Sequence, residues 1–259
     1  MTEEPTEVEA VGYEPVERLH FGRYHNIVIL TGAGVSVASG ISPFRGPGGL
    51  WNDPQVERLA HREILDTDPV AAWKFYSMLR ETAQNAQPNA AHSALVRLEA
   101  SLKPDQKFLL VTQNVDGLHQ KAGSRSMAEL HGSIHRTRCS DFNCTFTPFE
   151  DKEIYSKPPI CPSCGSVLRP GLVFFGEFTD ITVERTVKKA IRDCDLFISV
   201  GTSGTVYPAN QLVRSARIAG AMTIYINLEP LVDPGEESFY RTILGKAEEI
   251  LPKIIDPRK

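Results

Sequence analysis

The sequence predicts an α/β fold built on a doubly wound parallel sheet with a small inserted lobe, and three observations lead to this prediction. Four short apolar runs, rich in β-forming residues, lie at positions 27–31, 108–112, 196–200 and 223–227. None of them alternates apolar with polar residues, which is typical of strands buried on both faces. Helical patterns separate the runs, and one cysteine-rich segment at about 132–170 interrupts this alternation of strands and helices. Strands that alternate with helices give a parallel sheet covered on both faces.

Four segments between these strands are expected to be helices. Residues 69–83 are amphipathic, and residues 89–102 begin with a capping Asn and continue with good helix formers. Residues 184–192 lead into the third strand, and residues 208–219 begin with Pro208 and end before Gly220. A Pro in the first turn and a Gly just past the last turn are the expected asymmetry of a helix.

Charge and hydropathy exclude two classes of protein. The net charge is −4 and the pI is about 6.0, so the chain has no overall basic field that would gather DNA or RNA. No apolar run approaches the roughly 18 residues that a membrane span needs. We therefore expect neither direct nucleic-acid binding nor membrane insertion, and the sequence gives no oligomeric state.

The first residues are acidic and lack the basic start and apolar stretch of a secretion signal. We expect an acidic, solvated tail over residues 1–25, a catalytic domain over residues 26–259, and a cytoplasmic protein.

Small or polar residues follow each predicted strand, at positions 32–34, 113–116, 201–203 and 227–229. In open α/β sheets, ligands bind in the crevice beyond the carboxyl ends of the strands. These four segments are therefore expected to line one site.

The loop at residues 31–40 begins with Gly32 and Gly34, which would let backbone amides approach a phosphate closely. Val37 stands where the usual dinucleotide fingerprint has its third Gly, and a tight turn without a ligand is an equally good interpretation of this loop alone. The next segment, residues 41–51, is a long irregular loop that carries Phe44, Arg45 and Trp51. Long loops in compact domains are usually functional, which favours a cofactor site.

The chain has five cysteines, and four of them form two close pairs, Cys139 with Cys144 and Cys161 with Cys164. This spacing matches a four-thiolate zinc ribbon much better than four unrelated thiols. Four protein ligands leave zinc no open position, so we expect one structural zinc. Cys194 precedes an apolar run and is expected to be a small buried hydrophobe.

Together, a set of motifs that runs in order through residues 26–250 resembles the sirtuin family. The matching segments are residues 32–36, 38–41, 44–46, 112–119 and 131–132, the four cysteines, and residues 168–170, 175–177 and 201–203. Residues 206–209 and 227–230 are most similar to the bacterial and mitochondrial deacylase branch, often called class III.

The resemblance implies a large Rossmann-like domain, a small zinc lobe, and a cleft that NAD and an acyl-lysine protein substrate enter from opposite sides. The residues that would contact NAD are Gly32, Ala33, Gly34, Ser36, Phe44, Arg45, Trp51, Gln113, Asn114, Asp116, Gly201, Thr202, Ser203, Asn227, Leu228, Glu229 and Ala247. A strand through Val173, Gly176 and Glu177 would pair with the substrate peptide.

The resemblance also implies the reaction, which is NAD-dependent removal of an acyl group from lysine. His131 would act as general base on a ribose hydroxyl, and Asn114 and Asp116 would position the reacting ribose. Without that context, His131 would be interpreted as a packed or surface residue. The products would be free lysine, nicotinamide and O-acyl-ADP-ribose. ADP-ribosyl transfer to a protein, or NAD hydrolysis, is the alternative for the same cleft.

The expected acyl-reading helix departs from the class III pattern, in which a Tyr and an Arg three residues later usually bind the carboxylate of succinyl-lysine. Tyr76 is present, but Leu79 occupies the Arg position. Arg80 lies about 100° further round the helix and is expected to point to solvent or a surface partner. The alternative is that Leu79 is a core residue and Arg80 compensates after a small register shift. We expect acetyl or apolar acyl groups to be preferred over succinyl.

Overall fold

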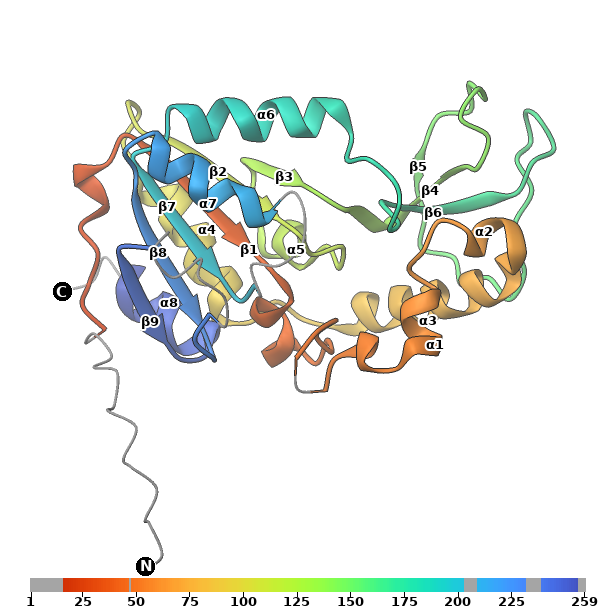
Figure 1. Cartoon of the computed structure of the whole chain (residues 1–259), viewed down its shortest axis with the longest axis horizontal. Helices are drawn as coiled ribbons and strands as arrows, with labels where there is room; N and C mark the ends of the chain where they lie inside the picture. Colours follow the sequence, from red (N-terminus) through yellow and green to blue (C-terminus); the bar gives the residue numbers. More distant parts are fainter. Residues whose placement is uncertain (1–15, 47, 203–208, 232–238, 256–259) are drawn as a thin grey trace, which may run out of the picture.

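The computed structural model describes residues 16–46, 48–202, 209–231 and 239–255, which form two lobes side by side (Figure 1). The larger lobe contains a six-stranded sheet, and the smaller lobe contains a three-stranded sheet together with helices. The predicted α/β class and the inserted lobe are both confirmed.

The large sheet is parallel throughout and has the strand order β3-β2-β1-β7-β8-β9. Its strands are β1 (Asn26–Thr31), β2 (Lys107–Thr112), β3 (Met127–Glu129), β7 (Leu196–Val200), β8 (Met222–Asn227) and β9 (Arg241–Leu244). The strand order reverses at β1, because the chain adds β2 on one side of it and β7 on the other. Such a switch point is where open α/β sheets bind ligands.

Helices cover both faces of this sheet (Figure 1). Ile27 and Ile29 of β1 pack in one core cluster with α4 (Ala90–Ser101) and α8 (Ala247–Ile255), whereas Val28 and Leu30 pack in another with α6 (Ile181–Arg192) and α7 (Ala209–Ile218). Successive residues of a strand point to opposite faces, so an unbroken apolar run supplies both clusters.

The four predicted strands correspond to β1, β2, β7 and β8, and the four predicted helices correspond to α3 (Pro69–Asn85), α4, α6 and α7. The outer strands β3 and β9 were not expected. A three-residue and a four-residue strand are too short to show a pattern in the sequence.

The second lobe is formed by two segments that are distant in the sequence. One contributes the antiparallel sheet β5-β4-β6, made of β4 (Gly132–Cys139), β5 (Phe149–Glu150) and β6 (Leu168–Leu172). The other contributes α1 (Pro54–Arg58), α2 (Ile64–Thr67) and α3. Trp73 of α3 donates a 2.8 Å hydrogen bond from its indole nitrogen to the Leu168 carbonyl. The predicted cysteine module is therefore only part of this lobe.

Short helical segments complete the described chain. These are the 3-10 turns η1 (Phe21–Arg23), η2 (Ala33–Val35), η3 (Val37–Ser39) and η4 (Leu50–Asn52), and the helix α5 (Leu118–Ala122).

The N-terminal segment is anchored before β1 begins. Leu19 is buried and its amide donates to the Ile254 carbonyl, while Phe21 and Tyr24 pack against the core. The described part of the expected tail is therefore not wholly solvated. Residues 1–15 of that tail lie outside the described residues. Within the described ranges, no helix has the length and apolar character needed to cross a membrane.

Candidate active site

The predicted cofactor loop follows β1 and packs tightly against the loop that follows β7. A Cβ atom on Gly32 or on Gly34 would lie 2.7 Å from backbone atoms of Gly201, and one on Gly201 would lie 2.7 Å from the Val35 amide nitrogen. Gly201 also has a φ of +61°, a conformation that side chains disfavour. Glycine is therefore required at these positions by the close approach of two backbones.

The amides of this loop are used within the protein. Gly32 donates to the Val200 carbonyl at 3.0 Å, Gly34 donates to the Gly201 carbonyl at 2.8 Å, and Ser36 donates to the Ala33 carbonyl at 2.9 Å. The amides of Gly32 and Gly34 thus have partners within the protein, and the close approach of backbone amides to a phosphate that these glycines would allow stays a prediction. The loop continues into the 3-10 turns η2 and η3 and not into an α-helix.

A buried polar cluster lies at the carboxyl ends of β1 and β2. The Ser36 hydroxyl donates to Asp116 Oδ2 at 2.7 Å, and Asn114 Nδ2 donates to the Gly32 carbonyl at 3.0 Å and to Ser36 Oγ at 3.2 Å. Burial raises the pKa of the Asp116 carboxyl, although hydrogen bonds from Leu118 and Ser36 act in the opposite direction. Three predicted site residues are thus brought together by side-chain hydrogen bonds.

The neighbouring strand ends connect to this cluster. Gln113 Nε2 donates to Thr202 Oγ1 at 2.8 Å, which joins the end of β2 to the end of β7. Asn227, the last residue of β8, donates to the Tyr225 hydroxyl and to the Thr202 carbonyl. Ser203 lies outside the described residues.

Three further predicted cofactor residues lie at the same edge of the sheet or near it. Leu228 and Glu229 follow β8 directly and are exposed, with Leu228 61% accessible. Ala247 begins α8 and is buried in the core beneath the sheet.

The loop at residues 41–51 forms a ladder of aromatic rings. The Phe44 ring lies 4.7 Å from the Trp51 ring, and the Trp51 ring lies 4.9 Å from the Phe175 ring. The Arg45 guanidinium lies 5.2 Å from the centre of the Trp51 ring. These contacts link the predicted cofactor loop to the predicted substrate strand.

A cavity of about 130 Å³ lies between the polar cluster and helix α3. The polar cluster supplies one part of its wall, and apolar side chains supply most of the rest. The lining residues are Ala33, Ser36, Gly40, Ile41, Ser42, Phe44, Leu50, Met78, Leu79, Thr82, Ala83, Asn114, Val115, Asp116 and Ile134. Among the residues that the structure describes, this lining has no Lys, Arg or His.

The two residues expected to select the acyl group differ in position. Leu79 lines the cavity, whereas Tyr76 is not among the described lining residues. The Tyr76 ring is buried against Phe75 and Phe174, and its hydroxyl donates to the Leu59 carbonyl at 3.1 Å.

The expectation for Arg80 was wrong. Its side chain is 1% exposed and pairs with Asp151 at 3.0 Å. Arg80 also donates from Nε to the Ile134 carbonyl and from Nη1 to the Glu153 carbonyl, both at 2.8 Å. The residue after Leu79 on the helix therefore faces β4 of the small sheet instead of solvent, and these bonds leave it no freedom to reach the cavity.

His131 follows β3 at the same edge of the large sheet. The amide of the preceding Leu130 donates to the Thr112 carbonyl, and the His131 carbonyl accepts a 3.0 Å hydrogen bond from Val173. The Nε2 atom of His131 is buried and has no hydrogen-bond partner in the structure. Burial lowers the pKa of this imidazole to about 4, below the ordinary value of roughly 6.5.

The predicted substrate strand is held by its own hydrogen bonds. The Phe175 amide donates to Ala60, and its carbonyl accepts from the Arg62 amide. The Glu177 carboxylate accepts hydrogen bonds from the buried Arg169 guanidinium and, at 3.0 Å, from the Phe174 amide. Glu177 thus fixes the shape of this strand, while Gly176 beside it adopts a φ of +89°.

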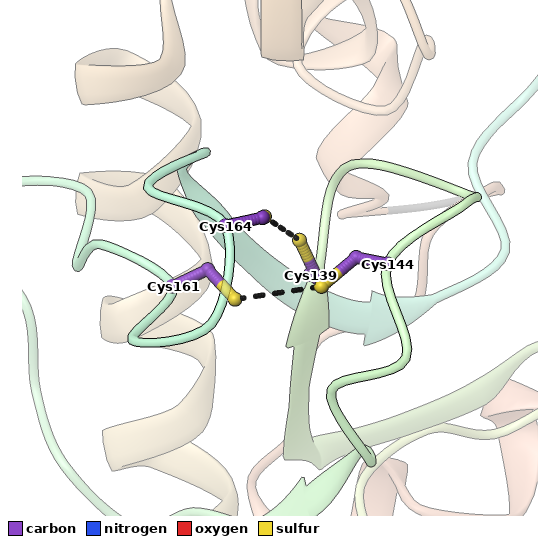
Figure 2. Close-up of side chains that lie close together, drawn as sticks. All are labelled: Cys139, Cys144, Cys161 and Cys164. Atoms are coloured by element: carbon purple, nitrogen blue, oxygen red, sulfur yellow. Dashed lines mark hydrogen bonds between the residues drawn. The ribbon is translucent and has the colours of Figure 1, made fainter.

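The four predicted zinc ligands converge in the small lobe: Cys139 ends β4, Cys144 lies in the loop after it, and Cys161 and Cys164 lie in the loop before β6 (Figure 2). Their sulfur atoms all lie within 4.8 Å of one another, with Cys139 and Cys164 at 3.5 Å and Cys144 and Cys161 at 3.8 Å. Tetrahedral zinc with Zn–S bonds of about 2.3 Å places its sulfurs roughly 3.8 Å apart. The donor set and its spacing therefore fit one structural zinc. Cys194 is buried away from this group, as expected.

Sequence reasoning missed several residues of the site. Met78 and Ile134 line the cavity but belong to none of the motifs described above, and Ile41 lies in the motif at residues 38–41 without an assigned role. His119 lies in the motif at residues 112–119, yet we had assigned it no role. Its Nε2 atom lies 3.0 Å from the Thr31 hydroxyl, directly behind the polar cluster.

A profile of the Sir2 family matches residues 32–208. The NAD-dependent protein deacylase 2 of Pyrobaculum aerophilum is 42% identical over 233 residues, which cover 90% of this chain and 90% of that protein. The mitochondrial NAD-dependent protein deacylase sirtuin-5 of Danio rerio is 34% identical over 268 residues, covering 92% of this chain and 85% of that protein.

A similar solved structure is a mutant Sir2 homologue in complex with 2′-O-acetyl ADP ribose. It superposes with a TM-score of 0.82 at 39% identity, covering 91% of this chain and 92% of that chain.

Proposed function

The chain belongs to the Sir2 family, and from this premise we propose that it is an NAD-dependent protein-lysine deacylase. NAD supplies the ADP-ribose that accepts the acyl group, and nicotinamide is released. Relatives named as NAD-dependent protein deacylases and a homologue solved with an acetylated ADP-ribose support this reaction. The substrates are acyl-lysine side chains of other proteins, and a cytoplasmic location remains a prediction from the sequence.

The observation that carries the proposal is the cavity at the switch point of the sheet. The polar residues Ser36, Asn114 and Asp116 form one wall, and mostly apolar side chains form the rest of the lining. Polar groups at one wall suit a sugar and an amide, whereas the apolar wall suits an alkyl chain. Such a cavity brings a ribose and an acylated lysine together.

We assign the binding of NAD to the loops at the carboxyl ends of β1, β2, β7 and β8. Gln113, Asn114 and Asp116 position the nicotinamide ribose, and Phe44 and Arg45 cover it. The hydrogen bonds that fix Asn114 and Asp116 before any ligand arrives support this assignment, because positioning alone contributes up to about 7–11 kcal/mol to catalysis.

We assign general-base catalysis to His131. A pKa lowered to about 4 keeps the imidazole neutral near pH 7, which is the form that accepts a proton. Its unpartnered Nε2 atom is available for this task. The hydrogen bond between its carbonyl and Val173 ties the base directly to the strand that we assign to the substrate peptide.

We propose that acetyl or longer apolar acyl groups are preferred over succinyl. Leu79 lines the cavity where its branch usually has an Arg, and Arg80 is committed to Asp151. The only charged group of the described lining is the acidic Asp116. A succinyl carboxylate in this cavity would therefore lose its hydration without gaining a cation.

Mass spectrometry of an acetyl-lysine peptide incubated with and without NAD tests the proposed function. We expect NAD-dependent loss of the acetyl group together with nicotinamide and O-acetyl-ADP-ribose. NAD consumption with the peptide unchanged would indicate hydrolysis instead, and a peptide heavier by an ADP-ribose unit would indicate ADP-ribosyl transfer.

A further inference from the structure

His119 is the second residue of α5 and is 1% exposed. Such a residue cannot touch a substrate or NAD. Its Nε2 atom nevertheless lies 3.0 Å from the hydroxyl of Thr31, the last residue of β1. Any effect of this side chain on the reaction is therefore transmitted through its contacts within the protein.

Thr31 connects His119 to the neighbouring strand through a second hydrogen bond. Thr31 and Thr112 are register partners at the carboxyl ends of β1 and β2, and the Thr31 hydroxyl donates to Thr112 Oγ1 at 3.0 Å. Thr112 Oγ1 also accepts a 3.0 Å hydrogen bond from the Asn114 amide. A relay of three hydrogen bonds thus runs from His119 to the backbone of Asn114.

The relay closes into a ring around the site. The Asn114 side chain donates to the Gly32 carbonyl and to Ser36 Oγ, and Ser36 donates to Asp116 Oδ2. The other Asp116 oxygen accepts from the amide of Leu118 at 2.9 Å, and Leu118 precedes His119. Both ends of the Asn114 and Asp116 segment therefore depend on the start of α5.

The direction of these bonds fixes the tautomer of His119. Because the Thr31 hydroxyl gives its hydrogen to Thr112, Nε2 of His119 donates to Thr31, and in the neutral ring Nδ1 then carries no proton. The ring packs 4.8 Å from that of His92, which is also buried. Nδ1 of His92 accepts from the Asn89 amide, and the remaining nitrogens of both rings have no partner in the structure. Burial keeps both imidazoles neutral by lowering their pKa values, to about 4 for His92 and about 3 for His119.

We propose that His119 is a positioning residue of the deacylase, which holds Asn114 in its reactive placement through Thr31 and Thr112. The inference rests on the role proposed above for Asn114. It assigns a function to a motif residue that neither contacts the cavity nor contributes to the apolar core. Displacement of a reacting group by about 1 Å can lower a rate roughly 10²-fold, so a relay of this kind has a measurable effect.

The first test compares His119→Leu with His119→Gln by steady-state kinetics on an acetyl-lysine peptide. The assay temperature is well below the melting temperature of the least stable variant. The amide of Gln can still donate to Thr31, whereas Leu cannot. We expect His119→Leu to lower kcat by about 10-fold to 100-fold while the Kd of ADP-ribose stays within about threefold, and His119→Gln to recover most of the rate. Leu98→Ala is the matched control, because it destabilises the core around helix α4, which packs against α5, without touching the relay.

A wild-type kcat in His119→Leu would overturn the proposal, and so would a His119→Gln enzyme as slow as His119→Leu. If Leu98→Ala lost as much kcat at an equal loss of stability, the effect would be one of stability and the proposal would fail.

The second test uses Thr31→Val, which is nearly isosteric and serves also if His119→Leu does not fold. We expect Thr31→Val to reproduce the loss of kcat, and the Thr31→Val/His119→Leu double variant to be no slower than either single variant, because both remove one relay. Multiplicative losses in the double variant, or a wild-type kcat in Thr31→Val, would refute the relay.

Asn114→Ala is measured alongside. A wild-type rate in Asn114→Ala would refute the proposed site itself, whereas an inactive Asn114→Ala with a fully active Thr31→Val would refute only the relay.

Discussion

His131 combines burial, a lowered pKa and an unpartnered Nε2 atom, and its carbonyl accepts a hydrogen bond from Val173 of the predicted substrate strand. We predict that His131→Ala lowers the kcat of deacylation by about 10²–10⁴-fold, the usual contribution of general acid–base catalysis. Binding of NAD, measured by calorimetry, should change little, since the base acts after the cofactor is seated.

His25→Ala is the control for this variant. Its side chain is 67% exposed and lies before β1, at the opposite edge of the sheet. Retention of more than about a tenth of the wild-type rate by His131→Ala would contradict a general-base role.

Leu79 is the residue at which acyl preference can be reversed. We predict that Leu79→Arg raises the ratio of kcat/KM for succinyl over acetyl peptides by roughly 10-fold to 100-fold, since a hydrogen bond to a charged group contributes about 1.5–3 kcal/mol. Glu81→Arg adds a cation at an exposed position of the same helix and should leave the ratio unchanged. A native enzyme that already prefers succinyl peptides would show that Leu79 is not the selector.

Single residues also show where sequence reasoning reaches its limit. The glycines of the cofactor loop could be identified from the sequence, but their physical reason could not, because Gly201 approaches them from a different strand. For Arg80, helical geometry correctly predicted a direction different from that of Leu79, yet the element on that side, β4, could not be known. Motifs reveal which residues matter, whereas partners that lie far along the chain decide what each one does.

At the scale of elements, α3 joins the metal site to the cavity. Trp73 packs with Cys139, Cys161 and Leu168, and six residues later on the same helix Leu79 lines the cavity. Structural zinc supplies folding free energy directly. Loss of the metal should therefore disturb the apolar part of the cavity lining, which includes Leu79, as well as the small sheet.

We predict one zinc per chain by elemental analysis, and its loss in Cys164→Ser. Removal of the metal by a chelator should shift the fluorescence of Trp73 to longer wavelength as its surroundings loosen. The measurement uses a Trp51→Phe background, because Trp51 and Trp73 are the only two tryptophans. Cys194→Ser, outside the cluster, should keep both the zinc and the emission. Active protein without zinc would contradict the assignment.

The elements that could be predicted are those whose own residues fill a core. β1 and β7 are buried along nearly their whole length, so their apolar runs are unmistakable. In β9 only Ile243 is buried, and β5 has two residues, so neither leaves a pattern. Helices α1 and α2 have only five and four residues, which is too short for a helical period to be recognised.

At the scale of the whole molecule, the two lobes are interleaved along the chain. Residues 54–85 and 132–172 form one lobe, and β1, β2, β7 and β8 form the sheet of the other. The sequence predicted an insertion at 132–170 because its cysteines mark it. It could not predict that α3 belongs to the same lobe, since that depends on contacts such as the one from Trp73 to Leu168.

Buried histidines make the stability of the whole molecule depend on pH. Burial lowers the pKa of His92 to about 4, of His119 to about 3 and of His131 to about 4. Above the unfolded-state value of roughly 6.5, these groups are neutral in both states and have no effect. As the pH falls below that value, the unfolded chain binds protons that the folded chain does not, so the free energy of unfolding decreases. Asp116 and Glu129, whose pKa values are raised by burial, oppose part of this loss.

We predict that the free energy of unfolding, measured with denaturant, is highest above pH 6.5 and falls steadily towards pH 4. The slope is about 1.4 kcal/mol per pH unit for each such histidine, so His92 and His119 should each cost roughly 2 kcal/mol by pH 5. His92→Gln cannot be protonated in this range and should flatten the profile, whatever its effect on stability at pH 7.5. His20→Gln, at an exposed position, should leave the slope unchanged. A free energy of unfolding that stays constant between pH 7.5 and pH 5 would contradict the lowered pKa values of these imidazoles, because it would mean that the folded and unfolded chains bind the same number of protons.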